Sequence, residues 1–302
     1  MRVRAGATSF GTAGIGQAAA GFLKLGVDAR AEAMGEAFSA VADDAGAMYW
    51  NPAALTNIEK RSATVMHAVY LASSYFDYAA YGQKVGDAGA CGAALQYFSA
   101  GAIRQTGPAG TGEGDFTPYD LAASVGCAYR LAPGGTLAGY SFGIAGKYVR
   151  SQILQSAQTL AADIGALSPA YLDGRLRFAF TAANLGGKLR FEREAESLPL
   201  VFKAGSSYKL SSRWLVSLDA GFPSDGSAFV GVGTEIVAAA SSSVDFAARA
   251  GFNSTTIGDV SGFTGASFGF GLASRGGSSI DYAIVPFGGL GQAHRVSMSC
   301  KF

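Results

Sequence analysis

The sequence contains few of the residues on which catalytic and metal sites usually depend. Its 302 residues include two histidines, three cysteines and eight prolines, and only 15% of them are charged. The cysteines, Cys91, Cys127 and Cys300, lie far apart, so no Cys-X-X-Cys metal or redox pair exists. One disulfide is possible, but we expect buried or lipid-facing thiols, because Cys127 and Cys300 fall on the apolar side of their segments. The net charge of +1 provides no electrostatic basis for binding nucleic acid.

Long apolar runs are missing as well. The mean hydropathy is +0.22, yet no stretch reaches the roughly 18 apolar residues of a membrane-spanning helix. A membrane protein with this sequence must therefore be a β-barrel, the other structure that satisfies its backbone in lipid. An exported barrel needs a signal sequence, and residues 5–25, which follow the charged start, lack a continuous apolar core. We therefore interpret the chain as a mature form or one with a misplaced start, its signal not shown.

The sequence instead shows alternation of apolar and polar residues from about residue 62 to the end. A period of two indicates strands with two different faces. Charged residues occupy one register, as do Lys147, Asp163, Arg177, Lys203, Lys209, Asp219, Glu235, Asp245, Arg249 and Asp281. The opposite register is apolar and often aromatic, as in Tyr140, Phe142, Ile144, Phe178, Phe180, Phe202, Val216, Leu218, Phe246, Phe268, Phe270, Ile280, Tyr282 and Ile284.

The composition of the two faces indicates what each one contacts. A soluble β-sandwich usually carries long Lys, Glu, Thr and Gln side chains on its solvent face, whereas the polar register here consists mostly of Gly, Ala and Ser. Small residues suit a crowded interior. A large aromatic face without charges suits lipid, where a charge at mid-depth costs roughly 2–4 kcal/mol. We therefore predict an all-β fold, a closed antiparallel transmembrane barrel whose apolar register faces the membrane.

The pattern divides into fourteen expected strands separated by connections that alternate in length. The short connections lie near 86–89, 133–135, 173–175, 211–212, 240–241 and 275–277, and the mostly longer ones near 106–116, 152–156, 192–198, 224–226, 254–262 and 287–291. Tight periplasmic turns and larger outer loops produce this alternation in outer-membrane barrels. The expected strands are 62–73, 75–85, 90–105, 117–132, 136–151, 157–172, 176–191, 199–210, 213–223, 227–239, 242–253, 263–274, 278–286 and 292–302.

Residues 1–61 form the remaining part, which we predict to be a partly helical plug inside the lumen of a barrel formed by 62–302. A barrel this wide has more room than its small inward side chains fill. The spacing of Met34, Ala37, Phe38 and Val41 predicts a helix over 28–42, and Asn51 before Pro52 predicts a capped second helix to about residue 61. We expect the charges of this segment to pair with lumen charges such as Arg177, Lys203 or Arg249. The candidate plug and lumen residues are Arg30, Met34, Phe38, Asp43, Asp44, Trp50, Asn51 and Pro52.

No catalytic or cofactor site emerges from the motifs. Two Gly-X-Ser-X-Gly matches, at 139–143 and 265–269, lie inside alternating segments without the following helix that a nucleophile elbow requires. The available bases are His67, on the apolar register, and His294, near the last hairpin. Asp43 and Asp44 could hold a cation, but a polar end to the expected helix explains them more simply. We expect no enzyme activity, no metal and no cofactor.

Several segments resemble the PorV/PorQ family of outer-membrane proteins. The first is Phe22-Leu23-Lys24-Leu25-Gly26-Val27-Asp28-Ala29-Arg30 with Met34-Gly35-Glu36-Ala37-Phe38, followed by Tyr49-Trp50-Asn51-Pro52-Ala53. Others are Asn184-Leu185-Gly186, Leu198-Pro199 and, near the end, Asp281-Tyr282-Ala283, Pro286-Phe287-Gly288 and His294-Arg295-Val296-Ser297. The chain departs from the family at Glu36 and Ala54, where the family usually has Gly. The resemblance covers 22–302 and implies a FadL-like barrel with an N-terminal segment inside, acting in type IX secretion.

Two functions are compatible with these observations. The resemblance implies a carrier that binds the C-terminal signal of secreted cargo and brings it to the surface attachment machinery; the alternative is a FadL-like transporter of hydrophobic small molecules. A transporter should have an apolar pocket between plug and wall, with a lateral gap at a strand kink. Polar and charged outer loops favour the carrier, and their candidate partner contacts are Glu113, Asp115, Phe116, Glu192, Arg193 and Glu194. Expected partners are membrane lipid, lipopolysaccharide, cargo or secretion components, and possibly a hydrophobic ligand, in the bacterial outer membrane.

Overall fold

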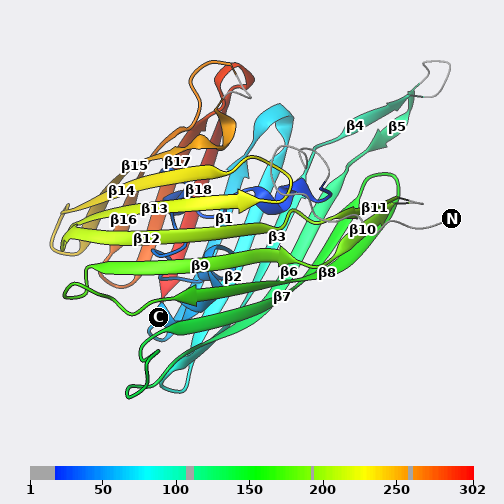
Figure 1. Cartoon of the computed structure of the whole chain (residues 1–302). Coiled ribbons are helices and arrows are strands. Elements are labelled where there is room, and N and C mark those ends of the chain that lie inside the picture. The colour runs from blue at the N-terminus through cyan, green and yellow to red at the C-terminus, as the bar shows by residue number, and fades with distance from the viewer. Residues whose placement is uncertain (1–17, 107–111, 192–193, 258–260) are drawn as a thin grey trace.

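Fourteen antiparallel strands close into a barrel in the computed structural model of the chain (Figure 1). The structure describes residues 18–106, 112–191, 194–257 and 261–302. Around the barrel the strands follow the order β1-β18-β17-β16-β15-β14-β13-β12-β9-β8-β7-β6-β3-β2, so the first strand pairs with the last and no barrel edge is left open. The predicted fold class, strand number and closure are confirmed.

Each barrel strand overlaps one of the fourteen predicted segments. The bounds are β1 Arg61–Val69, β2 Tyr75–Val85, β3 Gly89–Ser99, β6 Tyr119–Arg130, β7 Ser141–Gln152, β8 Ser156–Leu167, β9 Leu176–Leu185, β12 Val201–Ser211, β13 Trp214–Pro223, β14 Phe229–Ala239, β15 Val244–Asn253, β16 Ala266–Ser274, β17 Ser278–Pro286 and β18 Gln292–Lys301. Short 3-10 turns η4 (Leu71–Ser73), η5 (Ser254–Thr256) and η6 (Gly288–Leu290) lie in the connections. Within the described residues, no helix is both long and apolar enough to cross a membrane.

The alternation of the sequence corresponds to an outer and an inner face. Exposed side chains on the strands are mostly large and apolar, among them Val65, Leu95, Val125, Ile144, Leu160, Phe178, Phe180, Leu218, Val232, Phe268, Phe270, Ile280 and Met298. The buried positions between them include Lys147, Asp163, Asp219, Glu235, Arg249, Asp281 and Arg295. Side chains facing an open, water-filled lumen would be exposed, so the burial of these charges indicates that the lumen is occupied.

The two ends of the barrel differ. At one end, the hairpin end, two additional antiparallel ribbons extend beyond the barrel: β4 (Ile103–Thr106) with β5 (Gly112–Phe116), and β10 (Lys188–Phe191) with β11 (Glu194–Ser197) (Figure 1). We had predicted loops at 106–116 and 192–198; the chain extends each neighbouring pair of strands into a separate hairpin instead. The other end, the turn end, carries the connections 86–88, 131–140, 168–175, 212–213, 240–243 and 275–277, together with the start of β1 and the end of β18.

Two connections at the turn end are longer than predicted. The chain between β6 and β7 occupies 131–140, and that between β8 and β9 occupies 168–175, where we had expected turns at 133–135 and 173–175. Each segment folds back through its own hydrogen bonds, such as Leu131 N to Tyr140 O and Ser168 N to Phe178 O. Apolar residues such as Leu137 and Leu172 continue the alternation beyond the paired strands and are exposed there. This continued alternation made the predicted strands too long and the predicted turns too short.

Residues 18–60 lie against the inner face of the barrel as four short helical turns joined by irregular chain. These are η2 (Gly21–Lys24), α1 (Ala29–Ala33), α2 (Ala47–Trp50) and η3 (Pro52–Asn57), and α1 contacts β15, β16, β17 and β18. The predicted helix over 28–42 is wrong, because α1 ends at Ala33 and the next turn places Gly35 and Glu36 at φ values of 62° and 59°. Left-handed residues cannot continue an α-helix, and a segment surrounded by wall buries its apolar residues without needing one.

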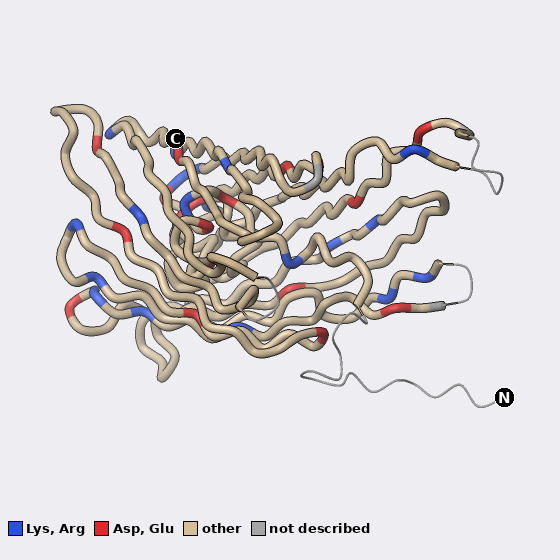
Figure 2. The backbone as a smooth tube through the Cα atoms, turned by 90° about the horizontal axis from the view of Figure 1, so that it is seen from above, with Lys and Arg blue, Asp and Glu red and all other residues tan. Residues whose placement is uncertain are grey.

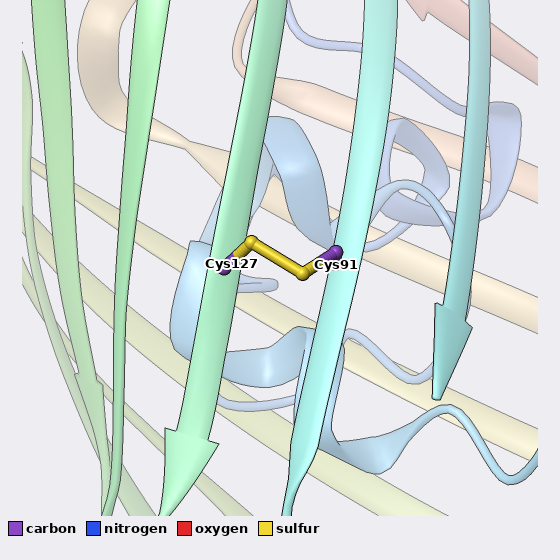
Figure 3. Close-up of a disulfide and its surroundings, with 2 residues drawn as sticks. All are labelled: Cys91 and Cys127. Carbon is purple, nitrogen blue, oxygen red and sulfur yellow. A yellow bond between two sulfur atoms is a disulfide. The ribbon is translucent and has the colours of Figure 1, made fainter. Parts of the chain in front are cut away.

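A disulfide links Cys91 of β3 to Cys127 of β6 on the outer face of the barrel (Figure 3). The two residues are direct partners in the antiparallel ladder, where opposed Cβ atoms lie close enough for a cross-strand bond. Our expectation of free thiols was therefore wrong for this pair, since alternation places a residue on a face but cannot pair it with a neighbour. Cys300 is a free, half-buried thiol.

Candidate binding cavity and the segment inside the barrel

The start of α1 is fixed to the last barrel strand by Asp28. Its carboxylate caps the helix by accepting from the Arg30 backbone N–H at 3.1 Å, and it accepts from the Ser297 hydroxyl at 2.6 Å. The Ala29 N–H donates to the same hydroxyl. The other carboxylate oxygen of Asp28, Oδ2, has no hydrogen-bond partner in the described chain. Burial, and then the nearby Asp44 carboxylate, raise the pKa of Asp28 to about 7.

Arg30 joins the segment to an inward row of charges on the wall. Its guanidinium contacts Glu235 of β14 at 2.8 Å and Asp43 at 2.9 Å. Glu235 also accepts from Arg249 of β15 at 2.6 Å, and Arg249 reaches Asp281 of β17 at 2.7 Å. The prediction that Arg30 pairs with lumen charges holds, although its wall partner is Glu235. Each buried charge in this row has a partner of opposite sign, as its removal from water requires.

Asp43 and Asp44 pair with groups other than the three lumen cations that we had expected. Asp43 contacts Arg30 and, at 3.2 Å, Lys301 of β18, while the described part of the chain places Arg249 with other carboxylates. Asp44 accepts from the Gly46 N–H at 2.8 Å and from the Ser299 hydroxyl at 3.4 Å. Lys301 and Ser299 of β18 are therefore the wall residues that contact these two carboxylates in the described chain.

A second buried ion pair, between Glu32 of α1 and Arg295 of β18, did not figure among our candidates. Both side chains are almost fully buried, and the Arg295 guanidinium also lies 5.7 Å from the centre of the Tyr70 ring. The sequence did contain a signal, because Arg295 is one of two cations, with Lys301, on the polar register of the final strand. Its partner could not be identified without knowing which turn of the inner segment faces β18.

Met34 and Phe38, two of the candidate plug residues, are fully buried. The Phe38 ring packs edge-on against Trp50 at 5.9 Å. Met34 lies directly on two wall glycines, since a Cβ at Gly233 or Gly251 would collide with its backbone. Glycine at these inward wall positions therefore leaves the room that the backbone of the segment occupies.

Trp50 and Asn51 fix the return of the chain toward β1. The Trp50 indole donates to the Val27 carbonyl at 3.1 Å, and the Lys203 ammonium lies 4.9 Å from the centre of its ring. Asn51 accepts from the Ala53 N–H at 3.0 Å, the predicted cap, and Pro52 begins η3 as a 3-10 turn. The Asn51 amide donates to Ala166 O of β8 as well, which ties this corner to the wall.

A cavity of about 770 Å³ lies at the hairpin end between the inner segment and the wall. Its apolar lining includes Leu23, Leu25, Tyr49, Trp50, Val201, Phe229, Ile257 and Phe287, and its charged lining includes Lys24, Glu32, Glu36, Lys147, Lys203, Asp225 and Arg295. The volume is that of a ligand-binding site. The mixed lining suits an amphipathic or peptide-like occupant better than a pure hydrocarbon.

The wall beside this cavity is interrupted in β9. Ile164 of β8 faces Ala182, but Ala162 faces Leu185, so β9 holds one extra residue at this point. Asn184 and the following Gly186 and Gly187 have positive φ values. Asn184 holds the bulge by accepting from Lys147 at 2.8 Å and donating to the Pro199 carbonyl at 3.0 Å. The β8–β9 ladder ends here, although β8 continues to Ser156.

The predicted outer contacts fall on the two hairpins. Asp115 and Phe116 belong to β5, where Asp115 lies opposite Arg104 and Phe116 opposite Ile103. Glu113 and Glu194 lie on β5 and β11; for these two we describe the backbone position alone. Glu192 and Arg193 lie outside the described residues.

A closed barrel of fourteen strands with a chain segment packed inside and a cavity at one end defines the FadL-like class of barrels. Solved structures with this fold include the toluene transporter TodX of Pseudomonas putida (TM-score 0.59, 12% identity, 91% of this chain and 96% of that chain covered). The Ralstonia pickettii toluene transporter TbuX aligns with a TM-score of 0.56 at 11% identity, covering 92% and 98%. A Pseudomonas aeruginosa FadL homologue aligns with a TM-score of 0.54 at 13% identity, covering 88% and 96%. At these identities the likeness concerns the fold alone.

The sequence comparison specifies the family. The model of the type IX secretion system protein PorV matches residues 13–211, and the chain belongs to this family of outer-membrane barrels. No curated protein matches the chain. The resemblance drawn from the sequence motifs is thus confirmed.

Proposed function

We propose that this barrel is a carrier for secreted proteins in the bacterial outer membrane, and that it binds an extended segment of its cargo at the hairpin end. The observation that carries the proposal is the pair of ribbons β4–β5 and β10–β11. Each is a separate two-stranded sheet in the described chain, and the unpaired edge of such a sheet can add a further strand. Family membership supports a role in type IX secretion.

One ribbon edge already receives an added chain from within the molecule. Ala18 forms a parallel bridge with Ser197 of β11, and the Ala19 N–H donates to the Ser197 carbonyl at 3.0 Å. Backbone pairing of this kind is largely independent of sequence. It therefore suits a carrier that accepts many different cargo proteins through a shared C-terminal signal.

The proposed docking edge is tested more directly on the β4–β5 ribbon than on the β10–β11 ribbon, because the described residues of β4–β5 are exposed or half-buried. A variant in which residues 103–116 are replaced by Gly-Gly should fold and lose binding of a purified cargo C-terminal domain by tenfold or more in biolayer interferometry. The control replaces residues 240–243 at the turn end by Gly-Gly and should bind normally. Equal binding by all three proteins would refute the proposed docking edge.

A second function, transport of an amphipathic small molecule, is favoured by the cavity and by the β9 bulge beside it. We expected of a transporter an apolar pocket between plug and wall with a gap at a strand kink; the cavity lies between the inner segment and the wall and borders the bulge, but its lining is mixed. Native mass spectrometry of the protein extracted in mild detergent would distinguish the two. A stoichiometric retained fatty acid, together with failure to bind the cargo domain, would favour the transporter.

We further infer that residues 18–60 act as a plug, that the apolar outer face contacts membrane lipid and lipopolysaccharide, and that the protein is not an enzyme. Both serines of the Gly-X-Ser-X-Gly matches lie on barrel strands and bond to neighbours or to the inner segment. Ser141 is 2.8 Å from the Thr56 hydroxyl, and Ser267 accepts from the Gly35 N–H at 3.2 Å. Their positions support packing roles.

A further inference from the structure

A second, smaller pocket opens at the turn end of the barrel, on the side of the inner segment away from the cavity. It has a volume of about 250 Å³ and is lined by the ends of β9, β12, β13 and β14 and by the inner segment. Figure 2 shows a group of Lys and Arg positions at the end of the barrel opposite the extended hairpins. The charged lining consists of five cations and two carboxylates: Arg30, Arg175, Arg177, Lys209, Arg213, Asp43 and Glu235.

The two carboxylates are already neutralised. Asp43 pairs with Arg30 and Lys301, and Glu235 pairs with Arg30 and Arg249. The other four cations of the lining form no ion pair with the described residues. In the part of the chain that the structure describes, no carboxylate oxygen lies within 4.0 Å of the charged nitrogens of Arg175, Arg177, Lys209 or Arg213.

Arg177 is the inward member of this group and shows how the excess charge accumulates. It donates to the Asn57 side-chain oxygen at 3.3 Å, and Arg130 donates to the same oxygen at 3.2 Å. Two guanidinium groups thus converge on a single neutral acceptor. Like charges this close repel each other, so an arrangement that holds them together gains stability from a bound anion.

We propose that this pocket binds an oxyanion of the phosphate class. Guanidinium groups bind such anions through paired N–H···O bonds, and a tetrahedral dianion can accept from several cations in different directions. A planar, singly charged carboxylate can satisfy fewer of the four. The hydroxyl of Ser212 in the lining adds a neutral donor. Free phosphate, which reaches two negative charges, and the phosphodiester of an anionic phospholipid headgroup, which carries one, both present such a tetrahedral oxyanion.

Isothermal titration calorimetry of the intact protein in an uncharged detergent tests the proposal, with sodium phosphate as the probe and sodium chloride at matched ionic strength as the blank. We expect saturable phosphate binding that weakens at least tenfold in Arg177→Gln. The same loss is expected in the double variant Arg175→Gln, Arg213→Gln. The matched control is Arg275→Gln, which removes an exposed cation from another turn at the same end.

The double variant keeps the test valid if Arg177→Gln fails to fold, because Arg175 and Arg213 are exposed turn residues. Native mass spectrometry with added dioleoylphosphatidylglycerol, and dioleoylglycerol as the phosphate-free control, separates the two sources. Phospholipid retained by the native protein and lost from the variants assigns the site to a headgroup; phosphate binding without retention assigns it to the free ion. Absence of both, or an equal loss in Arg275→Gln, would overturn the proposal.

Discussion

At the scale of single residues, the molecule depends on lone charges placed inward and matched across the lumen. Arg30, Glu32 and Asp43 of the inner segment each pair with a charge of the wall or of the segment itself. Asp28 differs because no cation lies within 4.0 Å of it among the described residues and one of its oxygens is unpaired. Asp28 is therefore one of two carboxyls of the segment through which stability should respond to pH; the other is Glu32, whose pKa burial raises to about 8.

We predict that the unfolding free energy decreases between about pH 4 and pH 7 because of Asp28. Its pKa in the folded protein is about 7, above its ordinary value of 3.8, so in this range the folded state holds a proton that the unfolded state has lost. Stability is then greatest below pH 4 and falls as the pH rises, by at most about 1.4 kcal/mol per pH unit for one proton. Urea unfolding in detergent at a series of pH values measures the slope.

Asp28→Asn should make this decrease less steep, leaving the part that Glu32 contributes, and be the more stable protein at pH 8, since an amide oxygen can still accept from Arg30 N–H but carries no charge. Asp173→Asn, in an exposed turn, serves as the control and should retain the native slope. An unchanged slope in Asp28→Asn would show that this carboxyl does not govern the pH response.

At the scale of elements, the β8–β9 ladder is interrupted by a bulge, a second register shift lies between Lys209 and Ser211 of β12, and the wall carries one covalent link, between β3 and β6. The hairpin β4–β5 lies between these two strands in the sequence. The two strands must therefore pair across a connection that is much longer than a tight turn. A cross-link between them restricts the unfolded chain more than the folded one. Its location on the outer face leaves the lumen unaffected.

We predict that iodoacetamide modifies one cysteine of the denatured, unreduced protein and three after reduction, because Cys91 and Cys127 are linked and Cys300 is free. Replacing both linked cysteines by Ala should lower the unfolding free energy by roughly 2–4 kcal/mol. Intact-mass spectrometry and urea unfolding are the measurements. Cys300→Ser is the control and should show no modification before reduction, whereas three modified cysteines before reduction would exclude the disulfide.

At the scale of the whole molecule, the inner segment separates the cavity of the hairpin end from the basic pocket of the turn end. If it closes the lumen, as we propose, then removing residues 1–50 should open a water-filled pore. Planar-bilayer recordings should show a clear rise in single-channel conductance over the intact protein. Deletion of residues 1–17 is the control, because it removes none of the described contacts. A large conductance in the intact protein would rule out a plug.

The strand pattern could be predicted from the sequence because a barrel in a membrane obeys local rules. Each strand alternates with a period of two, and lipid excludes charge from one side of every strand. Faces, strand number and closure follow from those rules, and the Asn51 cap follows from adjacent residues. The family was identified from several motifs together, because no single motif is specific enough to identify it.

Pairings inside the lumen could be read only from the tertiary structure. Arg295 meets Glu32, Arg30 meets Glu235, and Cys91 meets Cys127 because barrel closure and strand register bring together residues that are distant or unconstrained in the sequence. The predicted helix over 28–42 failed for the same reason. A segment enclosed by wall on every side loses the apolar and polar sides that make helical periodicity informative, and contacts with the surrounding strands then decide its course.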